Sequence, residues 1–143
     1  MKIVLAGGSG FLGRALTEHF SETGSEVVVL GRGSGLPSDF PKARFVRWDA
    51  ETRGAWESEL EEADALVNLC GRSVDCRYNE ENRRQIIDSR VNATKVLGEI
   101  CATLTHPPKI WLNSSTVTIY EDRRGDLSPH DEHSDDLGHG FSV

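Results

Sequence analysis

The stretch KIVLAGGSGFLG, residues 2–13, decides the fold of this 143-residue chain. Residues 2–6 are apolar after the lysine, as in a short buried strand, and Gly7, Gly10 and Gly13 follow at three-residue spacing. An amphipathic helix is predicted directly after Gly10, over residues 11–23. This order of strand, glycine turn and helix is what a dinucleotide-binding unit requires.

Each of these glycines has its own physical task. Gly7 lets the chain leave the strand sharply, because it can adopt backbone angles closed to other residues. Gly10 lets the backbone approach a pyrophosphate, and Gly13 lets the helix pack closely on the strand. The helix N-terminus would then point unpaired N–H groups at the phosphates. A tight turn without a ligand is the alternative, whereas a Walker-type phosphate loop is disfavoured because no Gly-Lys-Ser/Thr follows.

Strand and helix patterns alternate along the rest of the chain, which predicts a parallel sheet covered on both faces. Further strands are expected at 26–30, 44–48, 64–69 and 109–114, a short helix at 55–62 and a long one at 80–104. Residues 31–41 contain three glycines and two prolines and are expected to form a loop. The predicted fold class is α/β, a doubly wound parallel sheet of Rossmann type with strand order 3-2-1-4-5. Its ligand should lie at the carboxyl ends of the first and fourth strands.

Apolar spacing also predicts which helix faces are buried. In the first helix the expected buried residues are Phe11, Leu12, Ala15, Leu16 and Phe20. In the long helix they are Ile86, Ile87, Val91, Thr94, Leu97, Ile100, Cys101 and Leu104.

Composition excludes several classes of protein. A net charge of -7 disfavours non-specific nucleic-acid binding, and no apolar run approaches the roughly 20 residues that span a bilayer. Cys70, Cys76 and Cys101 are odd in number and form no CxxC pair, which argues against a disulfide framework or a zinc site. With no signal peptide recognised, we expect a cytoplasmic protein without a nucleic-acid, membrane or metal partner. Residues 1–120 should form one NAD(P)-binding domain, followed by an acidic, flexible segment at 121–143.

The end of the second expected strand bears on the choice of cofactor. An NAD site usually places an acid there to hold the ribose 2′-hydroxyl. This chain instead has Leu30, Gly31 and Arg32, with no acid until Asp39. Because a guanidinium can pair with a 2′-phosphate, NADP is favoured, with NAD as the alternative. Arg32 as a solvated loop residue is the competing interpretation.

Three motifs together resemble the extended short-chain dehydrogenase/reductase superfamily: GGSGFLG at 7–13, NLCG at 68–71 and SSTVTIY at 114–120. The nearest branch is that of the atypical, sugar-nucleotide-epimerase-like NAD(P)-binding proteins, whose members carry a phrase similar to residues 68–97. The resemblance covers essentially residues 1–133.

The resemblance implies roles for individual positions. It assigns cofactor contacts to Gly7, Ser9, Gly10, Phe11, Leu12, Gly13, Arg32, Asp49, Asn68, Cys70, Gly71 and Asn92. Within this set, Asp49 would contact adenine, Asn68 to Gly71 would pass the nicotinamide ribose, and Asn92 would brace the strands. Thr116, with Ser115 beside it, falls on the catalytic hydroxyl position that faces a substrate carbonyl. Residues 114–118 could instead only satisfy backbone groups at a strand end.

The catalytic pair of the superfamily is not found in this sequence. Its enzymes use a Tyr-x-x-x-Lys pair, in which the lysine lowers the pKa of the tyrosine. Tyr78 is followed at that spacing by Asn82, and Tyr120 by Arg124. The resemblance therefore implies a chain truncated before the sixth strand and the substrate lobe. The surface left by the missing half would favour a homo-oligomer.

Two functions from different classes remain open. The favoured one is the NADP-binding part of an epimerase/dehydratase-like oxidoreductase, which transfers hydride at a hydroxyl or carbonyl carbon of a small, sugar-nucleotide-like substrate. The alternative is a non-catalytic NAD(P)-binding or protein-interaction module. In that case the Arg-rich block 72–90 would be a partner surface, unless it is only a solvated helix face.

Overall fold

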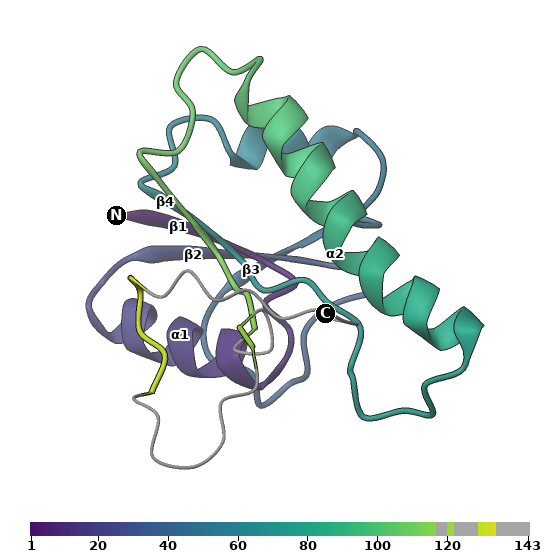
Figure 1. Ribbon diagram of the computed structural model, residues 1–143. Coiled ribbons are helices and arrows are strands. Elements are labelled where there is room, and N and C mark those ends of the chain that lie inside the picture. Colours follow the sequence, from purple (N-terminus) through teal and green to yellow (C-terminus); the bar gives the residue numbers. More distant parts are fainter. Residues whose placement is uncertain (117–119, 122–128, 134–143) are drawn as a thin grey trace.

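Five parallel strands form the sheet of this computed structural model, which describes residues 1–116, 120–121 and 129–133. The strands are β1 (Lys2–Ala6), β2 (Glu26–Gly31), β3 (Arg44–Arg47), β4 (Ala65–Asn68) and β5 (Ile110–Asn113). Their order is β3-β2-β1-β4-β5, and every neighbouring pair is parallel (Figure 1). The predicted fold class and strand order are confirmed.

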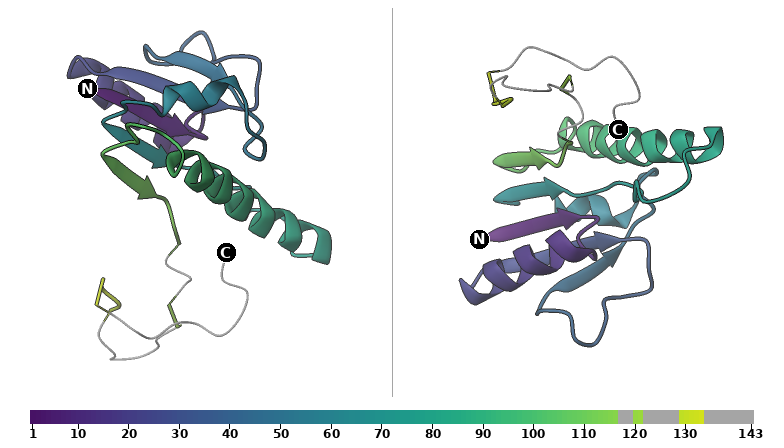
Figure 2. Two further views of the ribbon diagram at one scale, coloured as in Figure 1. Left: turned by 90° about the horizontal axis from the view of Figure 1, so that it is seen from above. Right: turned by 60° about the horizontal axis from the view of Figure 1, so that its bottom comes forward.

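The helices cover the two faces of this sheet. Helix α1 (Phe11–Glu22) lies on one face, while the short 3-10 helix η1 (Ala55–Glu59) and helix α2 (Glu80–Cys101) lie on the other (Figures 1 and 2). No helix among the described residues is long and apolar enough to cross a membrane. Most of the segment 121–143, which was predicted to be flexible, lies outside the described residues, as do 117–119.

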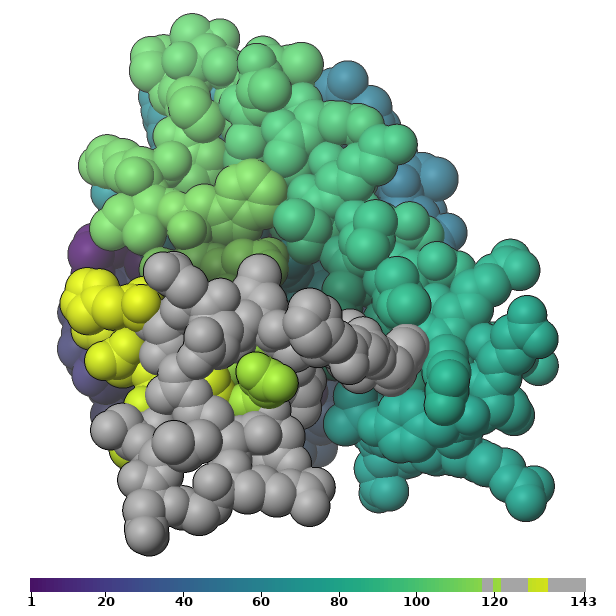
Figure 3. All heavy atoms as spheres, viewed as in Figure 1, coloured from purple at the N-terminus to yellow at the C-terminus, as the bar shows by residue number. Residues whose placement is uncertain are grey.

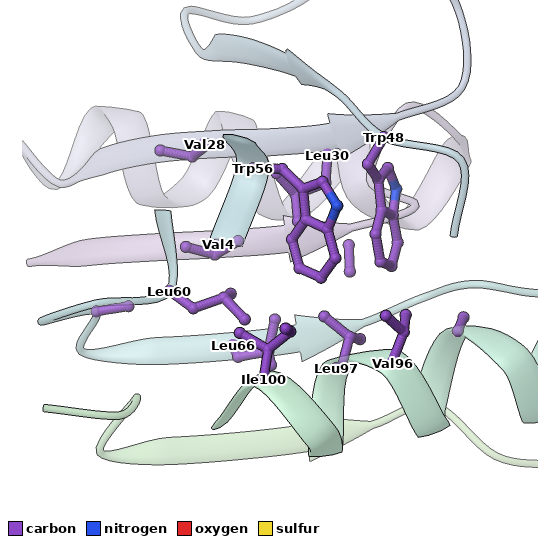
Figure 4. Packing of buried hydrophobic residues seen from close by; sticks show 13 residues of the cluster. Val4, Val28, Leu30, Trp48, Trp56, Leu60, Leu66, Val96, Leu97 and Ile100 are labelled. Atoms are coloured by element: carbon purple, nitrogen blue, oxygen red, sulfur yellow. The ribbon is translucent and has the colours of Figure 1, made fainter. Parts of the chain in front are cut away.

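The larger core cluster fills the space between the sheet and α2. Alternate strand residues meet apolar side chains of α2 and of the η1 region: Val4, Val28, Leu30 and Leu66 face Trp48, Trp56, Leu60, Val96, Leu97 and Ile100 (Figure 4). The rings of Trp48 and Trp56 pack edge to face, with centroids 4.9 Å apart. Burial of these side chains holds the C-terminal half of α2 against the strands.

The smaller cluster lies on the α1 face. Ile3, Leu5, Val27 and Val29 of β1 and β2 pack there against Leu16 and Phe20 of α1. Leu36 and Phe40 from the β2–β3 connection complete the cluster. The connection was predicted to be a loop, and its two apolar side chains cover the part of the sheet that a second helix would otherwise cover.

Five helix positions predicted to be buried are exposed: Phe11, Leu12, Ala15, Ile87 and Val91. Phe11 and Leu12 are 87% and 57% exposed, because the first turn of α1 lies at the edge of the sheet, and Gly13 and Thr17 are its buried residues. Ile87 and Val91 are 42% and 55% exposed. Val91 lies five residues after the buried Ile86, about 140° round the helix, and so on the outer face. Figures 2 and 3 show that α2 projects past the strand ends and that its outer side is molecular surface.

Candidate functional site

A hollow of about 320 Å³ opens at the carboxyl ends of the strands, where the fold predicts a ligand. Its walls come from the segments that leave β1, β2, β3 and β4, together with one turn of α2. The lining residues are Gly7, Ser9, Gly10, Gly31, Arg32, Trp48, Asp49, Ala50, Glu51, Leu69, Cys70, Gly71 and Ser89.

The hollow brings together seven of the residues predicted to hold a cofactor. These are Gly7, Ser9, Gly10, Arg32, Asp49, Cys70 and Gly71. Five others do not line it: Phe11, Leu12, Gly13, Asn68 and Asn92. A cofactor contact by any of these residues stays a prediction. Six lining residues were missed, of which Gly31, Trp48 and Leu69 could have been found because each stands at or directly after the end of an expected strand.

The glycine loop has the geometry that its sequence predicted. Gly7 has φ +72°, and its N–H donates to the carbonyl of Leu30 at 2.9 Å, which turns the chain across the end of β2. A Cβ on Gly13 would lie 2.0 Å from the carbonyl oxygen of Gly8. A Cβ on Gly10 would have no atom within 4 Å, so the space above Gly10 is open.

The N-terminus of α1 begins at the same place. Gly10 is its N-cap and supplies no side-chain cap, and no acidic residue lies in the first turn. The first N–H groups of a helix have no partner within the helix and carry the positive end of its dipole. The open space over Gly10 and the N-terminus of a 12-residue helix thus form a cradle suited to a phosphate.

The opposite wall is the segment after β4. Burial raises the pKa of the Cys70 thiol to about 12, so Cys70 presents a neutral side chain to the hollow. Two hydrogen bonds join Arg72 of this wall to α2. Its N–H donates to Ser89 Oγ at 2.9 Å, and its carbonyl accepts from Arg90 Nη1 at 3.2 Å. The Arg90 guanidinium fills the space that a side chain on Gly71 would need. The wall is therefore held by contacts behind it.

Asn68 joins this wall to β5. It is 3% exposed, and its Nδ2 donates to Asn113 Oδ1 at 2.7 Å and to Thr94 Oγ1 at 3.1 Å. Its Oδ1 accepts from the N–H of Cys70 at 3.1 Å. From α2, Thr94 thus braces β4 and β5, and a bracing role of Asn92 stays a prediction. Asn92 itself reaches Glu51 at 3.5 Å, because it lies on a different side of α2.

Asp49 shapes the turn after β3. Its carboxylate accepts from the hydroxyl of Thr52 and from the N–H groups of Thr52 and Glu51, at 2.8 and 2.9 Å for the latter two. These hydrogen bonds lower the pKa of Asp49 to about 2. The charged carboxylate is therefore engaged in holding the turn, while its contact with adenine stays a prediction.

Arg32 enters the hollow from the end of β2. The guanidinium has no hydrogen bond or ion pair among residues 1–116, 120–121 and 129–133. The next acid along the chain, Asp39, is paired with Arg14 at 3.1 Å. The Arg32 guanidinium is thus available for an anionic ligand.

The predicted catalytic hydroxyls follow β5. The N–H of Ser114 donates to the carbonyl of Asn68 at 2.9 Å, which continues the pairing of β4 and β5. Ser115 is exposed and Thr116 half-buried, and neither lines the hollow. Their catalytic role stays a prediction. Across the described ranges, no group of three or more His, Cys, Asp and Glu residues has the arrangement of a metal site.

Known proteins resemble this chain in sequence. The Bacillus subtilis epimerase family protein YfhF is 33% identical over 120 residues, which are 84% of this chain and 39% of that protein. The human epimerase family protein SDR39U1 is 32% identical over 124 residues, 85% of this chain and 39% of its own length. The chain therefore spans about two fifths of the length of these relatives.

Solved structures agree with this likeness. The crystal structure of human SDR39U1 (isoform 2) with NADPH matches 85% of this chain and 38% of that one, with TM-score 0.69 and 30% identity. A UDP-glucose-4-epimerase from Stenotrophomonas maltophila with bound NAD matches 99% of this chain and 44% of its own, with TM-score 0.78. At 18% identity the second likeness concerns the fold alone.

The sequence model of one family matches residues 3–139, nearly the whole chain. Together with the glycine loop and the sheet order, this match shows that the chain belongs to the NAD dependent epimerase/dehydratase family.

Proposed function

We propose that this chain binds a nicotinamide dinucleotide, with NADP preferred and NAD accepted more weakly. The observation that carries the proposal is the pairing of open space over Gly10 with the unpaired Arg32 in one hollow. Gly10 and the N-terminus of α1 suit a pyrophosphate, and Arg32 suits the phosphate that distinguishes NADP from NAD. A relative of 30% identity, human SDR39U1, has been crystallised with NADPH, which supports the same choice.

The reaction we propose is hydride transfer at a carbon that bears a hydroxyl or carbonyl group in a small, sugar-nucleotide-like substrate. The bound cofactor supplies or accepts the hydride, and the protein orients it. Gly7, Ser9 and Gly10 would hold the phosphates, and Cys70 and Gly71 would form the wall beside the nicotinamide ribose. A hydroxyl of Ser115 or Thr116 would donate a hydrogen bond to the substrate oxygen whose charge changes during the transfer.

A non-catalytic dinucleotide-binding module is the second candidate. It is favoured by the tyrosines, since Tyr78 and Tyr120 both lack a lysine four residues later. In the Arg-rich block 72–90, which would form the partner surface of such a module, two arginines already bind other groups of this chain. Arg72 donates to Asn82 Oδ1 at 2.9 Å, and Arg90 donates to two backbone carbonyls of the same region. Both guanidiniums are engaged within the chain.

Titration of the purified protein with NADPH and with NADH tests the cofactor proposal. Trp48 lines the hollow, so its fluorescence should change when a nicotinamide dinucleotide binds. We expect tighter binding of NADPH, and we expect Arg32→Glu to reverse that preference by placing a carboxylate beside the 2′-position. Failure to bind either cofactor, with the fold intact by circular dichroism, would overturn the proposal.

Substitution of the hydroxyls predicted to be catalytic distinguishes the enzyme from the non-catalytic module. The enzyme proposal expects Thr116→Val or Ser115→Ala to lower turnover while NADPH still binds. If both variants bind the cofactor and retain every measurable activity, these hydroxyls have no catalytic role. The non-catalytic module would then be the better description.

A further inference from the structure

A second hollow, of about 410 Å³, adjoins the dinucleotide hollow. The two share Arg32, Trp48 and Asp49 in their walls, so they lie next to each other. Arg47 and Arg53 line only the second hollow. The indoles of Trp48 and Trp56 lie side by side at this end of the core (Figure 4). Because these rings are packed in the core, the second hollow has a rigid base.

The second hollow is rich in positive charge. Three arginines line it, in a chain whose net charge is -7. Arg47, like Arg32, has no hydrogen bond or ion pair within the described part of the chain. Arg53 is bound to the carboxylate of Glu57 through two nitrogens, Nη2 at 2.7 Å and Nε at 3.2 Å. The one carboxylate in the wall, Asp49, is held by Thr52 and by two backbone N–H groups.

Strand pairing explains why Arg47 reaches this place. Arg47 is the last residue of β3 and stands opposite Gly31, the last residue of β2. The N–H of Trp48 donates to the carbonyl of Gly31 at 3.0 Å, so the two strand ends are locked together. Arg32 follows Gly31 directly. The two unpaired arginines therefore leave adjacent strands at the same edge of the sheet.

We propose that the second hollow binds the 2′-phosphate monoester of the dinucleotide and that Arg47 is a specificity-determining residue alongside Arg32. This inference rests on the proposed function, because it places the adenosine end of the cofactor where the two hollows meet. Guanidinium groups bind phosphate oxygens through charge-assisted hydrogen bonds and can do so with two donors at once. Arg53 would donate further hydrogen bonds to the phosphate after releasing Glu57.

Two small nucleotides test this assignment without a nicotinamide ring. Adenosine 2′,5′-bisphosphate and adenosine 5′-monophosphate differ only by the 2′-phosphate, and their affinities can be measured by isothermal titration calorimetry. We expect the protein to bind the bisphosphate more tightly. Arg47→Gln should weaken bisphosphate binding about tenfold, the size of one charge-assisted hydrogen bond, and leave the monophosphate unchanged.

Matched variants control for net charge and for folding. Arg84→Gln makes the same charge change on the outer surface of α2, where Arg84 is 82% exposed and lines neither hollow, so it should leave both affinities unchanged. Arg53→Gln should also weaken the bisphosphate selectively, by less than Arg47→Gln. Raising the salt concentration should reduce the difference between the two nucleotides, because screening weakens exposed charge pairs.

The outcomes distinguish this inference from the proposed function. If Arg47→Gln and Arg53→Gln bind the bisphosphate as the unmodified protein does, while NADPH still binds, the assignment of the second hollow fails and the cofactor proposal stands. Equal loss in Arg84→Gln would also overturn the assignment, since net charge alone would explain it. If the unmodified protein binds neither nucleotide nor dinucleotide, both proposals fail.

Discussion

Two glycines three residues apart should respond to alanine in opposite ways. In Gly13→Ala the new methyl group would lie 2.0 Å from the carbonyl oxygen of Gly8 and 2.4 Å from its carbonyl carbon. Both atoms are backbone, so they cannot move aside as a flexible side chain could. Overpacking of this kind costs about 3 kcal/mol, whereas alanine gains about 1 kcal/mol over glycine in a helix. We expect a net loss of about 2 kcal/mol, or about 6–8 °C in Tm for a chain of this size.

Gly10→Ala should leave stability nearly unchanged and weaken cofactor binding. The new methyl group would meet no atom within 4 Å. Alanine is a poorer N-cap than glycine by about 0.5–1 kcal/mol, and a smaller gain from the unfolded state offsets part of that cost. The methyl group would, however, occupy the path proposed for the pyrophosphate. A steric conflict of about 1–3 kcal/mol corresponds to roughly a 5- to 150-fold loss of NADPH affinity.

Thermal unfolding by circular dichroism and NADPH titration measure the two effects. Gly35→Ala is the matched control, because its methyl group also meets no atom within 4 Å and it does not line the dinucleotide hollow. A Gly13→Ala protein as stable as the unmodified chain would refute the close approach of helix and loop. Unchanged NADPH affinity in Gly10→Ala would refute the pyrophosphate path.

Three further perturbations follow from side-chain contacts. The Arg44 guanidinium donates to Glu59 and holds the pKa of this carboxyl below its usual 4.5. Glu59→Gln should therefore lower the free energy of unfolding by about 1 kcal/mol at neutral pH. Urea titrations should show this difference vanishing as the pH falls through the lowered pKa. Burial raises the pKa of Cys70 from 9.0 to about 12, so the folded protein resists its ionisation and stability should fall above pH 9.0. Melting curves of Cys70→Ala should show a smaller fall, because burial also raises the pKa of the Cys101 thiol. Arg90→Met removes the donors to the carbonyls of Arg72 and Ile86, and hydrogen exchange in the loop after β4 should accelerate while NADPH affinity drops severalfold.

The fold could be predicted from the sequence because the patterns that mark its strands and helices are local. The β-branched run at 26–30 and the glycine loop each predict an element without knowledge of the rest, and β2 and α1 begin where those signals place them. Burial was harder to predict. Apolar spacing marks one face of a helix, yet it does not show where the sheet beneath that helix ends. Phe11 and Leu12 were therefore assigned to the core, although they lie on a turn that extends past it.

The site shows the same limit. Gly7, Gly10 and Arg32 were found because a strand end or a glycine spacing marks them in the sequence. Ser89 was missed because its place in the wall depends on a tertiary contact, since its hydroxyl accepts from the N–H of Arg72 across the loop. Arg47 has no motif at all. It lines the second hollow only because the register of β3 on β2 brings their last residues together.

Asn68 connects the two halves of the proposed chemistry. Through its side chain it holds the N–H of Cys70, where the cofactor wall begins, and the side chain of Asn113, the last residue of β5. Its backbone carbonyl accepts from Ser114, where the segment with the predicted catalytic hydroxyls begins. A buried amide bound on all sides is costly to displace, since each broken hydrogen bond would leave an unsatisfied polar group. The spacing between cofactor wall and hydroxyl segment is therefore set by this residue, which explains an asparagine in an otherwise apolar strand without requiring that it touch the cofactor.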